Sequence, residues 1–127
     1  MQIDHVGVAT DEAAALATQY AELFATEIAH EEVRDGMDIY FLPVGETYFE
    51  FLEPLDDGPI ADFLDREGPG LHHVAVTVDS AVDALDRARA LGIEPIDDQP
   101  RPGAWGHDVA FLHPRDTGSV LLEFVGY

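Results

Sequence analysis

Two histidines and two glutamates lie at matching places in two similar stretches of this chain. His5 and His73 each interrupt a short apolar run, and Glu50 and Glu123 each interrupt another apolar run further along. Imidazole and carboxylate groups anchored on strands are donors that divalent zinc, cobalt, nickel and manganese accept. Four such donors would leave two positions on a six-coordinate ion for oxygen atoms of a substrate. We therefore predict that His5, Glu50, His73 and Glu123 bind one divalent metal ion, with cobalt, manganese, nickel, zinc and magnesium all open.

Each of these four residues also has an ordinary structural interpretation. A single histidine in a strand usually packs in the core or on the surface, and a single glutamate usually faces solvent. The recurrence of both residue types at equivalent positions is what favours a metal site. His72 follows the opposite alternation from His73, so we expect its side chain to pack on the other face of the strand.

The similarity between the two stretches covers most of the chain and indicates two copies of one folding unit. Residues 3–8 resemble 71–76, residues 39–43 resemble 110–114, and residues 49–52 resemble 122–125. Alternating apolar residues, separated by turn signals such as Asp35-Gly36 and Thr117-Gly118, predict strands. The expected strands are 2–9, 28–34, 37–43, 47–53, 71–78, 93–98, 107–113 and 119–125.

An alanine-rich amphipathic segment follows the first strand of each copy and predicts a helix there. Asp11 and Asp79 stand where the N-caps of these two helices are expected, and Gly92 stands where the second helix should end. Residues 54–70 connect the copies and contain a short helix around 60–66. Each copy therefore has the order strand, helix, strand, strand, strand.

A unit of about 60 residues is too small to close a core by itself, so the two copies must pack together. We expect an α+β fold in which two βαβββ repeats form a curved eight-stranded mixed sheet with a metal-binding cleft. Residues 1–127 would form one domain. The first repeat would occupy about 1–54, the linker 55–70 and the second repeat about 71–127.

The chain is strongly acidic. It has 26 acidic residues against six basic ones, all arginine, a formal net charge of −20, and no cysteine. This charge disfavours partners such as nucleic acid or an anionic membrane, and the lack of cysteine excludes disulfides, thiolate zinc sites and thiol catalysis. A hydrophobic content of 46% in periodic blocks indicates a folded chain. Lysine-free acidic composition is typical of salt-accumulating microbes, so we expect a halophilic protein.

Two further features bear on location. No apolar stretch is long enough to cross a bilayer, and the apolar pattern already begins at Ile3, which argues against a signal peptide. We therefore expect a cytoplasmic protein.

With these residues in view, the chain resembles the vicinal oxygen chelate superfamily, which includes glyoxalase I and the extradiol dioxygenases. Within that superfamily it looks like the methylmalonyl-CoA epimerase family. The histidine and glutamate positions are specific only to the superfamily, and other segments narrow the resemblance. These segments are Glu53-Pro54-Leu55, Pro59-Ile60-Ala61 with Phe63-Leu64, and Phe111-Leu112-His113-Pro114.

The resemblance implies metal-dependent interconversion of (R)- and (S)-methylmalonyl-CoA, by α-proton abstraction through an enolate intermediate. The thioester oxygen and the carboxylate of this substrate can chelate one ion, and chelation stabilises the enolate. Inversion then needs a base on one side of the α-carbon and an acid on the other. By resemblance, Glu123 is one of these two groups and also a metal ligand.

The second group is less clearly defined. Some members of the family carry a glutamate on the third strand of the first repeat, where this chain has Asp38. Alternation places Asp38 on the face opposite to Ile39 and Phe41, so we expect it to point into the cleft as the second catalytic group. A surface acid in an acidic protein is the alternative interpretation, and Glu31, Glu32 and Glu53 are weaker substitutes.

Three more residues are candidates for substrate binding. The phosphates of coenzyme A need cationic partners, and Arg101 and Arg115 lie on loops expected at the cleft. Trp105, in a Pro-Gly-Ala-Trp-Gly loop, stands where the family often has histidine, and we expect it to shape the rim of the cleft. Relatives of this fold commonly form dimers, so we also expect a homodimer.

Two other functions remain open from the sequence. One is a glyoxalase I-like lyase that acts on a thiol adduct. The other is a non-enzymatic small-molecule binding protein of the same fold, although such binders generally lack the complete set of metal ligands.

Overall fold

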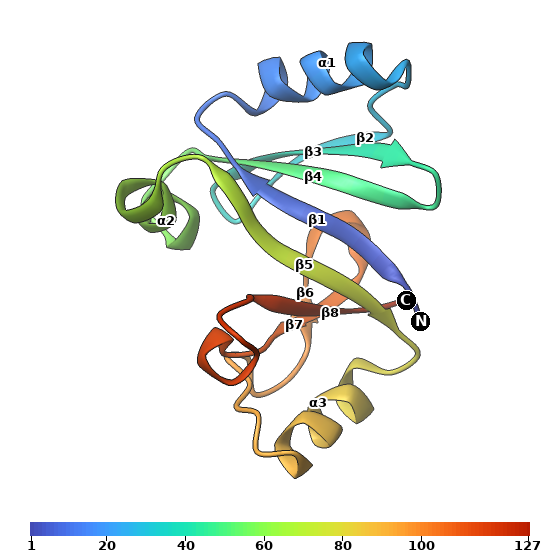
Figure 1. The fold of residues 1–127 in the computed structure, drawn as a ribbon, viewed down its shortest axis with the longest axis vertical. Coiled ribbons are helices and arrows are strands. Elements are labelled where there is room, and N and C mark those ends of the chain that lie inside the picture. The colour runs from blue at the N-terminus through green and yellow to red at the C-terminus, as the bar shows by residue number, and fades with distance from the viewer. The chain divides into compact units, whose positions relative to one another are not determined.

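A computed structural model describes all residues 1–127, with eight strands and three α-helices (Figure 1). The strands hydrogen-bond in two runs, β2-β3-β4-β1 and β5-β8-β7-β6. Two pairs, β1 with β4 and β5 with β8, are parallel, and the β2–β3, β3–β4, β6–β7 and β7–β8 pairs are antiparallel. The expected α+β class with an eight-stranded mixed sheet is confirmed. The strands are β1 (Ile3–Ala9), β2 (His30–Arg34), β3 (Met37–Val44), β4 (Thr47–Pro54), β5 (Gly70–Val78), β6 (Arg101–Pro102), β7 (Asp108–Phe111) and β8 (Leu122–Gly126).

The contacts of the chain divide it into two compact units. The N-terminal unit is His5–His72, and the C-terminal unit combines Met1–Asp4 with His73–Tyr127. The N-terminal unit contains α1 (Ala13–Phe24) and α2 (Pro59–Glu67), and the C-terminal unit contains α3 (Ala81–Ala90). No helix of the chain is both long and apolar enough to span a membrane.

In the N-terminal unit, α1 lies along β3 and β4 (Figure 1). Its small residues Ala13 and Ala17 are fully buried, which lets the helix approach Leu42 and Phe51 of the sheet closely. The expected N-cap at Asp11 is wrong, because Glu12 occupies the cap position and makes no side-chain cap bond. The first turn is instead satisfied from β4, where Oε1 of Glu53 accepts a hydrogen bond from the backbone N–H of Ala13 at 2.8 Å.

In the C-terminal unit, α3 packs on β7 and β8. The N-cap is Ser80 and not Asp79, since the Ser80 hydroxyl accepts the N–H of Asp83 at 3.1 Å, three residues on, where an N-cap side chain reaches best. Gly92 has a φ of +79° directly after the helix and ends it as expected.

The strand expected at 93–98 is absent. That segment makes only an isolated bridge between Pro95 and Leu112, and β6 is a two-residue strand that begins at Arg101. Proline has no N–H to donate to a ladder, which disfavours a strand through Pro95. In addition, the Asp97 carboxylate accepts the N–H of Phe111 at 2.8 Å, a donor that a neighbouring strand would otherwise use.

A tight turn sets the register of the first hairpin. Asp35 and Gly36 both have positive φ, 51° and 73°, the combination that a two-residue type I′ turn requires between twisted strands. The resulting pairing of β2 with β3 places His30 directly opposite Phe41. The next hairpin places Phe41 opposite Glu50.

Candidate metal centre

The N-terminal unit holds one of the two expected imidazole–carboxylate pairs. His5 on β1 and Glu50 on β4 come from adjacent parallel strands, and each is only 5% exposed. Nε2 of His5 lies 3.2 Å from Oε1 of Glu50. Since the register puts Gly7 opposite Glu50, no side chain stands between the strands at that point to separate the two groups.

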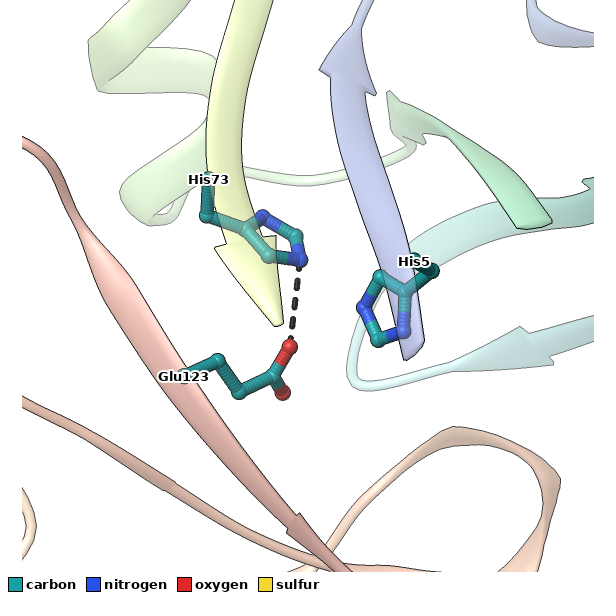
Figure 2. A group of neighbouring side chains, drawn as sticks. All are labelled: His5, His73 and Glu123. Carbon is teal, nitrogen blue, oxygen red and sulfur yellow. Dashed lines mark ion pairs between the residues drawn. The ribbon is translucent and has the colours of Figure 1, made fainter. Parts of the chain in front are cut away.

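The C-terminal unit holds the equivalent pair. His73 on β5 and Glu123 on β8 again come from adjacent parallel strands, and they are 5% and 6% exposed. Nε2 of His73 lies 3.1 Å from Oε1 of Glu123, the ion pair drawn as a dashed line in Figure 2. The two units thus repeat the same strand pairing, the same residue types and nearly the same distance.

A phenylalanine accompanies each pair. The ring of Phe41 meets that of His5 edge-on at 5.7 Å, and the ring of Phe111 meets that of His73 edge-on at 5.5 Å. Phe41 lies opposite Glu50, and Phe111 lies opposite Glu123. Phe111 is therefore the counterpart of Phe41. The expected match of residues 39–43 with 110–114 is wrong by one residue.

The donor set fits a divalent metal ion. His5, His73 and Glu123 are buried and each offers a ligand atom of a type that binds metals. Glu50 is buried to the same degree beside His5. Buried carboxylates are costly unless they have a cationic partner, and a metal ion is such a partner. With nitrogen and oxygen donors and no thiolate, the set suits the borderline and hard divalent ions.

Asp38 does not lie on the same face as the His5–Glu50 pair. Alternate residues of a strand share a face. Phe41 contacts His5, and because Phe41 follows Asp38 by three residues on β3, the two side chains point to opposite faces. Asp38 shares its face with Tyr40, which packs against the α1 side of the sheet. The expectation that Asp38 points toward the metal-binding face is wrong, because a shift of one residue along a strand reverses every side chain.

The carboxylate of Asp38 has a different partner. Burial is the largest cause that raises the pKa of Tyr40 above its ordinary value of 10.0, and the charge of Asp38 and a side-chain hydrogen bond with it add to the effect. Glu31 and Glu53 raise the pKa of Tyr40 further. Together these residues form an acidic group around one phenol on the helix-facing side of the sheet.

The three expected substrate-binding residues lie in different surroundings. Arg101 on β6 places its guanidinium 5.7 Å from the centre of the Phe111 ring, the ring that also contacts His73, and its Nε donates to Asp97 at 3.1 Å. Arg115, in the 3₁₀ turn Pro114–Asp116, pairs with Glu94. Trp105, in the turn Ala104–Gly106, is half-buried and has a φ of +60°, which is unusual for a bulky residue.

Two other histidines have structural contacts. The ring of His72 packs edge-on against Phe63 at 4.9 Å, which agrees with its expected packing role. Nδ1 of His113 accepts the N–H of Arg115 at 3.3 Å and caps the 3₁₀ turn.

Sequence reasoning did not single out His30, and it ranked Glu32 low. On β2 the alternate residues His30, Glu32 and Arg34 are half-buried, whereas the residues between them are exposed. Nε2 of His30 lies 2.9 Å from Oε1 of Glu32, and Nε of Arg34 donates to Oε2 of Glu32 at 3.2 Å. The sequence did carry a sign of this group, because His30, Glu32 and Arg34 are polar residues at alternate positions of one strand.

Comparison with known proteins assigns a family. The sequence profile of the Glyoxalase/Bleomycin resistance protein/Dioxygenase superfamily matches residues 4–111. An ethylmalonyl-CoA/methylmalonyl-CoA epimerase of Cereibacter sphaeroides is 33% identical over 127 residues, covering 96% of this chain and 95% of the relative. The chain therefore belongs to the Glyoxalase/Bleomycin resistance protein/Dioxygenase superfamily. Its resemblance to the methylmalonyl-CoA epimerases is confirmed by this relative and by the mitochondrial methylmalonyl-CoA epimerase of Mus musculus, which is 32% identical over 126 residues and is covered over 71% of its length by 96% of this chain.

Solved structures agree with that assignment. A hypothetical protein of Bacillus halodurans superposes with a TM-score of 0.95 at 36% identity, covering 99% of this chain and 94% of the other. Methylmalonyl-CoA epimerase of Streptomyces coelicolor, in complex with 2-nitronate-propionyl-CoA, superposes with a TM-score of 0.94 at 30% identity, with the same coverages of 99% and 94%.

Proposed function

We propose that this protein is a metal-dependent epimerase that interconverts (R)- and (S)-methylmalonyl-CoA. The observation that carries the proposal is the pair of equivalent, buried imidazole–carboxylate groups, one in each unit, at 3.2 Å and 3.1 Å. The match to a known relative supports the same substrate class, because an ethylmalonyl-CoA/methylmalonyl-CoA epimerase is matched over 96% of this chain and 95% of its own length.

In this proposal His5, Glu50, His73 and Glu123 hold one divalent ion. The ion would supply Lewis-acid stabilisation of the negative charge that develops on the substrate oxygens. Each carboxylate lies against an imidazole, which fixes the carboxylate orientation before substrate arrives. Cobalt, manganese, nickel, zinc and magnesium all remain within the range that nitrogen and oxygen donors accept.

The protein groups carry out the proton transfer. Glu123 takes the α-proton from one epimer, and the electron pair of the C–H bond passes to the thioester oxygen as the enolate forms. A second group returns a proton to the opposite face of the α-carbon, which completes the inversion. Low exposure of Glu123 keeps bulk water away from the carboxylate that handles this proton.

Arg101 and Arg115 are the proposed partners of the coenzyme A phosphates, with Trp105 shaping the rim. A guanidinium binds phosphate well because it offers several donors in one plane. Each arginine already pairs with one carboxylate, through Asp97 and Glu94 respectively. Both guanidiniums are about half exposed and so can be approached from solvent.

The remaining expectations complete the proposal. The protein would act in the cytoplasm as a homodimer, with the whole chain as one domain. Its net charge of −20 repels the phosphates of the substrate unless salt screens it. We therefore propose that molar KCl raises both stability and activity, and unchanged behaviour between low and molar KCl would rule out the halophilic assignment.

Deuterium exchange tests the function. Metal-loaded protein is incubated with methylmalonyl-CoA in heavy water, with and without a chelator, and both α-deuteration and epimerisation are followed. Exchange and epimerisation that disappear with chelator and return with metal support the proposal. A metal-loaded protein that exchanges nothing, yet converts a methylglyoxal–thiol adduct, is a lyase and not an epimerase.

A further inference from the structure

Strand β2 has an inverted polarity. Its half-buried side is formed by His30, Glu32 and Arg34, whereas Val33 on the other side is 67% exposed. A strand normally buries its apolar residues and exposes its charges, so departures from that pattern mark places where function has overridden packing. The polar side of β2 is also ordered internally, since both oxygens of Glu32 are engaged, one by His30 and one by Arg34.

This polar side faces the same way as the His5–Glu50 pair. His30 lies directly opposite Phe41, and Phe41 lies directly opposite Glu50, so the three residues form one row across β2, β3 and β4. Directly opposed residues of neighbouring strands share a face. The Phe41 ring contacts His5 at 5.7 Å and lies 6.2 Å from His30. A small molecule resting on Phe41 is thus within reach of both imidazoles.

The two units differ at this position. In the C-terminal unit the Phe111 ring has His73 on one side and the guanidinium of Arg101 on another, and Arg101 is held by Asp97. In the N-terminal unit the Phe41 ring has His30 beside it, held by Glu32. The two neighbours are not at equivalent positions, since His30 is paired with Phe41 whereas Arg101 is paired with Val109. A guanidinium stays charged at all working pH values and cannot carry a proton back and forth. An imidazole can do so near neutral pH.

We propose that His30 is the second proton-transfer group of the epimerisation, with Glu32 as its positioning residue and Arg34 fixing Glu32. This inference rests on the proposed function. Because Nε2 of His30 faces Glu32, Nδ1 accepts the α-proton of one epimer. A nitrogen–hydrogen bond forms as the carbon–hydrogen bond breaks, and the electron pair moves to the thioester oxygen. The other proton-transfer group then gives its proton to the other face of the α-carbon. A carboxylate beside an imidazole orients it and stabilises its protonated form.

A variant in which one of two bases is lost has a distinctive exchange pattern. Pure (R)- and pure (S)-methylmalonyl-CoA are incubated separately in heavy water with wild type, His30→Gln and the control variant His113→Gln. For His30→Gln we expect epimerisation to fall about 100-fold or more, the usual contribution of a general base. We expect α-deuteration of one epimer to fall equally, while the other epimer still exchanges without inverting. His113→Gln should match wild type in all assays.

Other outcomes overturn the assignment. Wild-type exchange of both epimers by His30→Gln would show that His30 moves no proton. Loss of both exchange reactions would also refute it, because a group that serves one epimer cannot abolish exchange of the other. Failure of the proposed function is distinguishable, since wild type itself would then exchange neither epimer.

Glu32 variants keep the test independent of His30→Gln. If Glu32 positions the imidazole, Glu32→Gln should lower α-deuteration only for the epimer that His30 serves, and should lower kcat of epimerisation equally in both directions at unchanged KM. Glu32→Asp, which retains the carboxylate, should recover part of that loss. An equal fall in α-deuteration of both epimers, or no recovery with Asp, would assign Glu32 a merely structural role.

Discussion

Loading the protein with a divalent ion should raise its thermal stability through two equivalent carboxylates. Glu50 is 5% exposed and Glu123 is 6% exposed, and their carboxylate oxygens lie 3.2 Å and 3.1 Å from Nε2 of His5 and of His73. If both ligate one ion, Glu50→Gln and Glu123→Gln should weaken binding to similar extents. Loss of a ligand should weaken binding by about a hundredfold, the upper end of the ten- to hundredfold range known for loss of outer partners of metal ligands.

The size of the effect follows from linkage. At a free metal concentration 100 times the dissociation constant, binding to the folded chain alone adds about 2.7 kcal/mol to the free energy of unfolding. For a chain of this length 1 kcal/mol moves Tm by about 4 °C, so metal should raise Tm by about 10 °C. After a hundredfold loss of affinity the same metal concentration adds only about 0.4 kcal/mol, which is less than about 2 °C.

Scanning calorimetry of chelator-treated and metal-loaded protein measures these increments. Glu53→Gln is the matched control, because Glu53 lies on the same strand as Glu50 but on the opposite face, where it accepts the N–H of Ala13. The control should keep the full metal-dependent increment. The reasoning is refuted if Glu50→Gln and Glu123→Gln retain it as well, and the equivalence of the two pairs is refuted if only one of them loses it.

Three further predictions follow from the packing and the charges. Asp38→Asn should retain epimerisation and α-proton exchange in the deuterium assay, because Asp38 faces away from the His5–Glu50 pair; loss of both activities would contradict this. Because the pKa of Tyr40 is raised in the folded chain, its phenol proton is lost at lower pH in the unfolded chain than in the folded one. The free energy of unfolding should therefore fall as pH rises above 10.0. Tyr40→Phe should flatten that fall in denaturant titrations at alkaline pH, and an unchanged slope would exclude Tyr40 as its source. A Cβ at Gly103 would lie 2.7 Å from Val109, so Gly103→Ala should lower the free energy of unfolding by about 1–3 kcal/mol, and an unchanged denaturation midpoint would show that the loop yields freely.

The metal-binding candidates were predictable because a strand alternates its side chains strictly. His5, Glu50, His73 and Glu123 interrupt apolar runs in the sequence, and all four are buried in the structure. Each repeat contains one such histidine and one such glutamate. This recurrence is why two common residue types indicated a metal site.

The proposed second proton-transfer group, His30, was not predictable in the same way. Which face of β3 carries the site depends on a register of one residue, and the family resemblance led us to place Asp38 on that face. Only the pairing of Phe41 with Glu50 and of Phe111 with Glu123 reveals it. His30 then follows, because it is opposite Phe41.

Two other expectations, the N-cap of α1 and the strand at 93–98, were wrong because side-chain carboxylates accept the backbone hydrogen bonds there. A side-chain carboxylate from β4 satisfies the first turn of α1, and no helix residue signals this arrangement in advance. The Asp97 carboxylate accepts a hydrogen bond from the backbone N–H of Phe111. Residues 93–98 therefore need not form a strand to satisfy that donor. In both cases a residue distant in sequence supplies a bond that local propensity assigns to neighbours.

The repeated phenylalanine has an evolutionary consequence. A chain of two identical half-chains would present the same side chain beside both rings, and a reaction that must tell the two faces of one carbon atom apart would gain nothing from it. Here the ring in one half is flanked by Arg101 and the ring in the other by His30. Divergence of the residues beside the two rings gives one half a guanidinium and the other an imidazole. The fusion of two halves into one gene is what allows such a division of labour to be inherited.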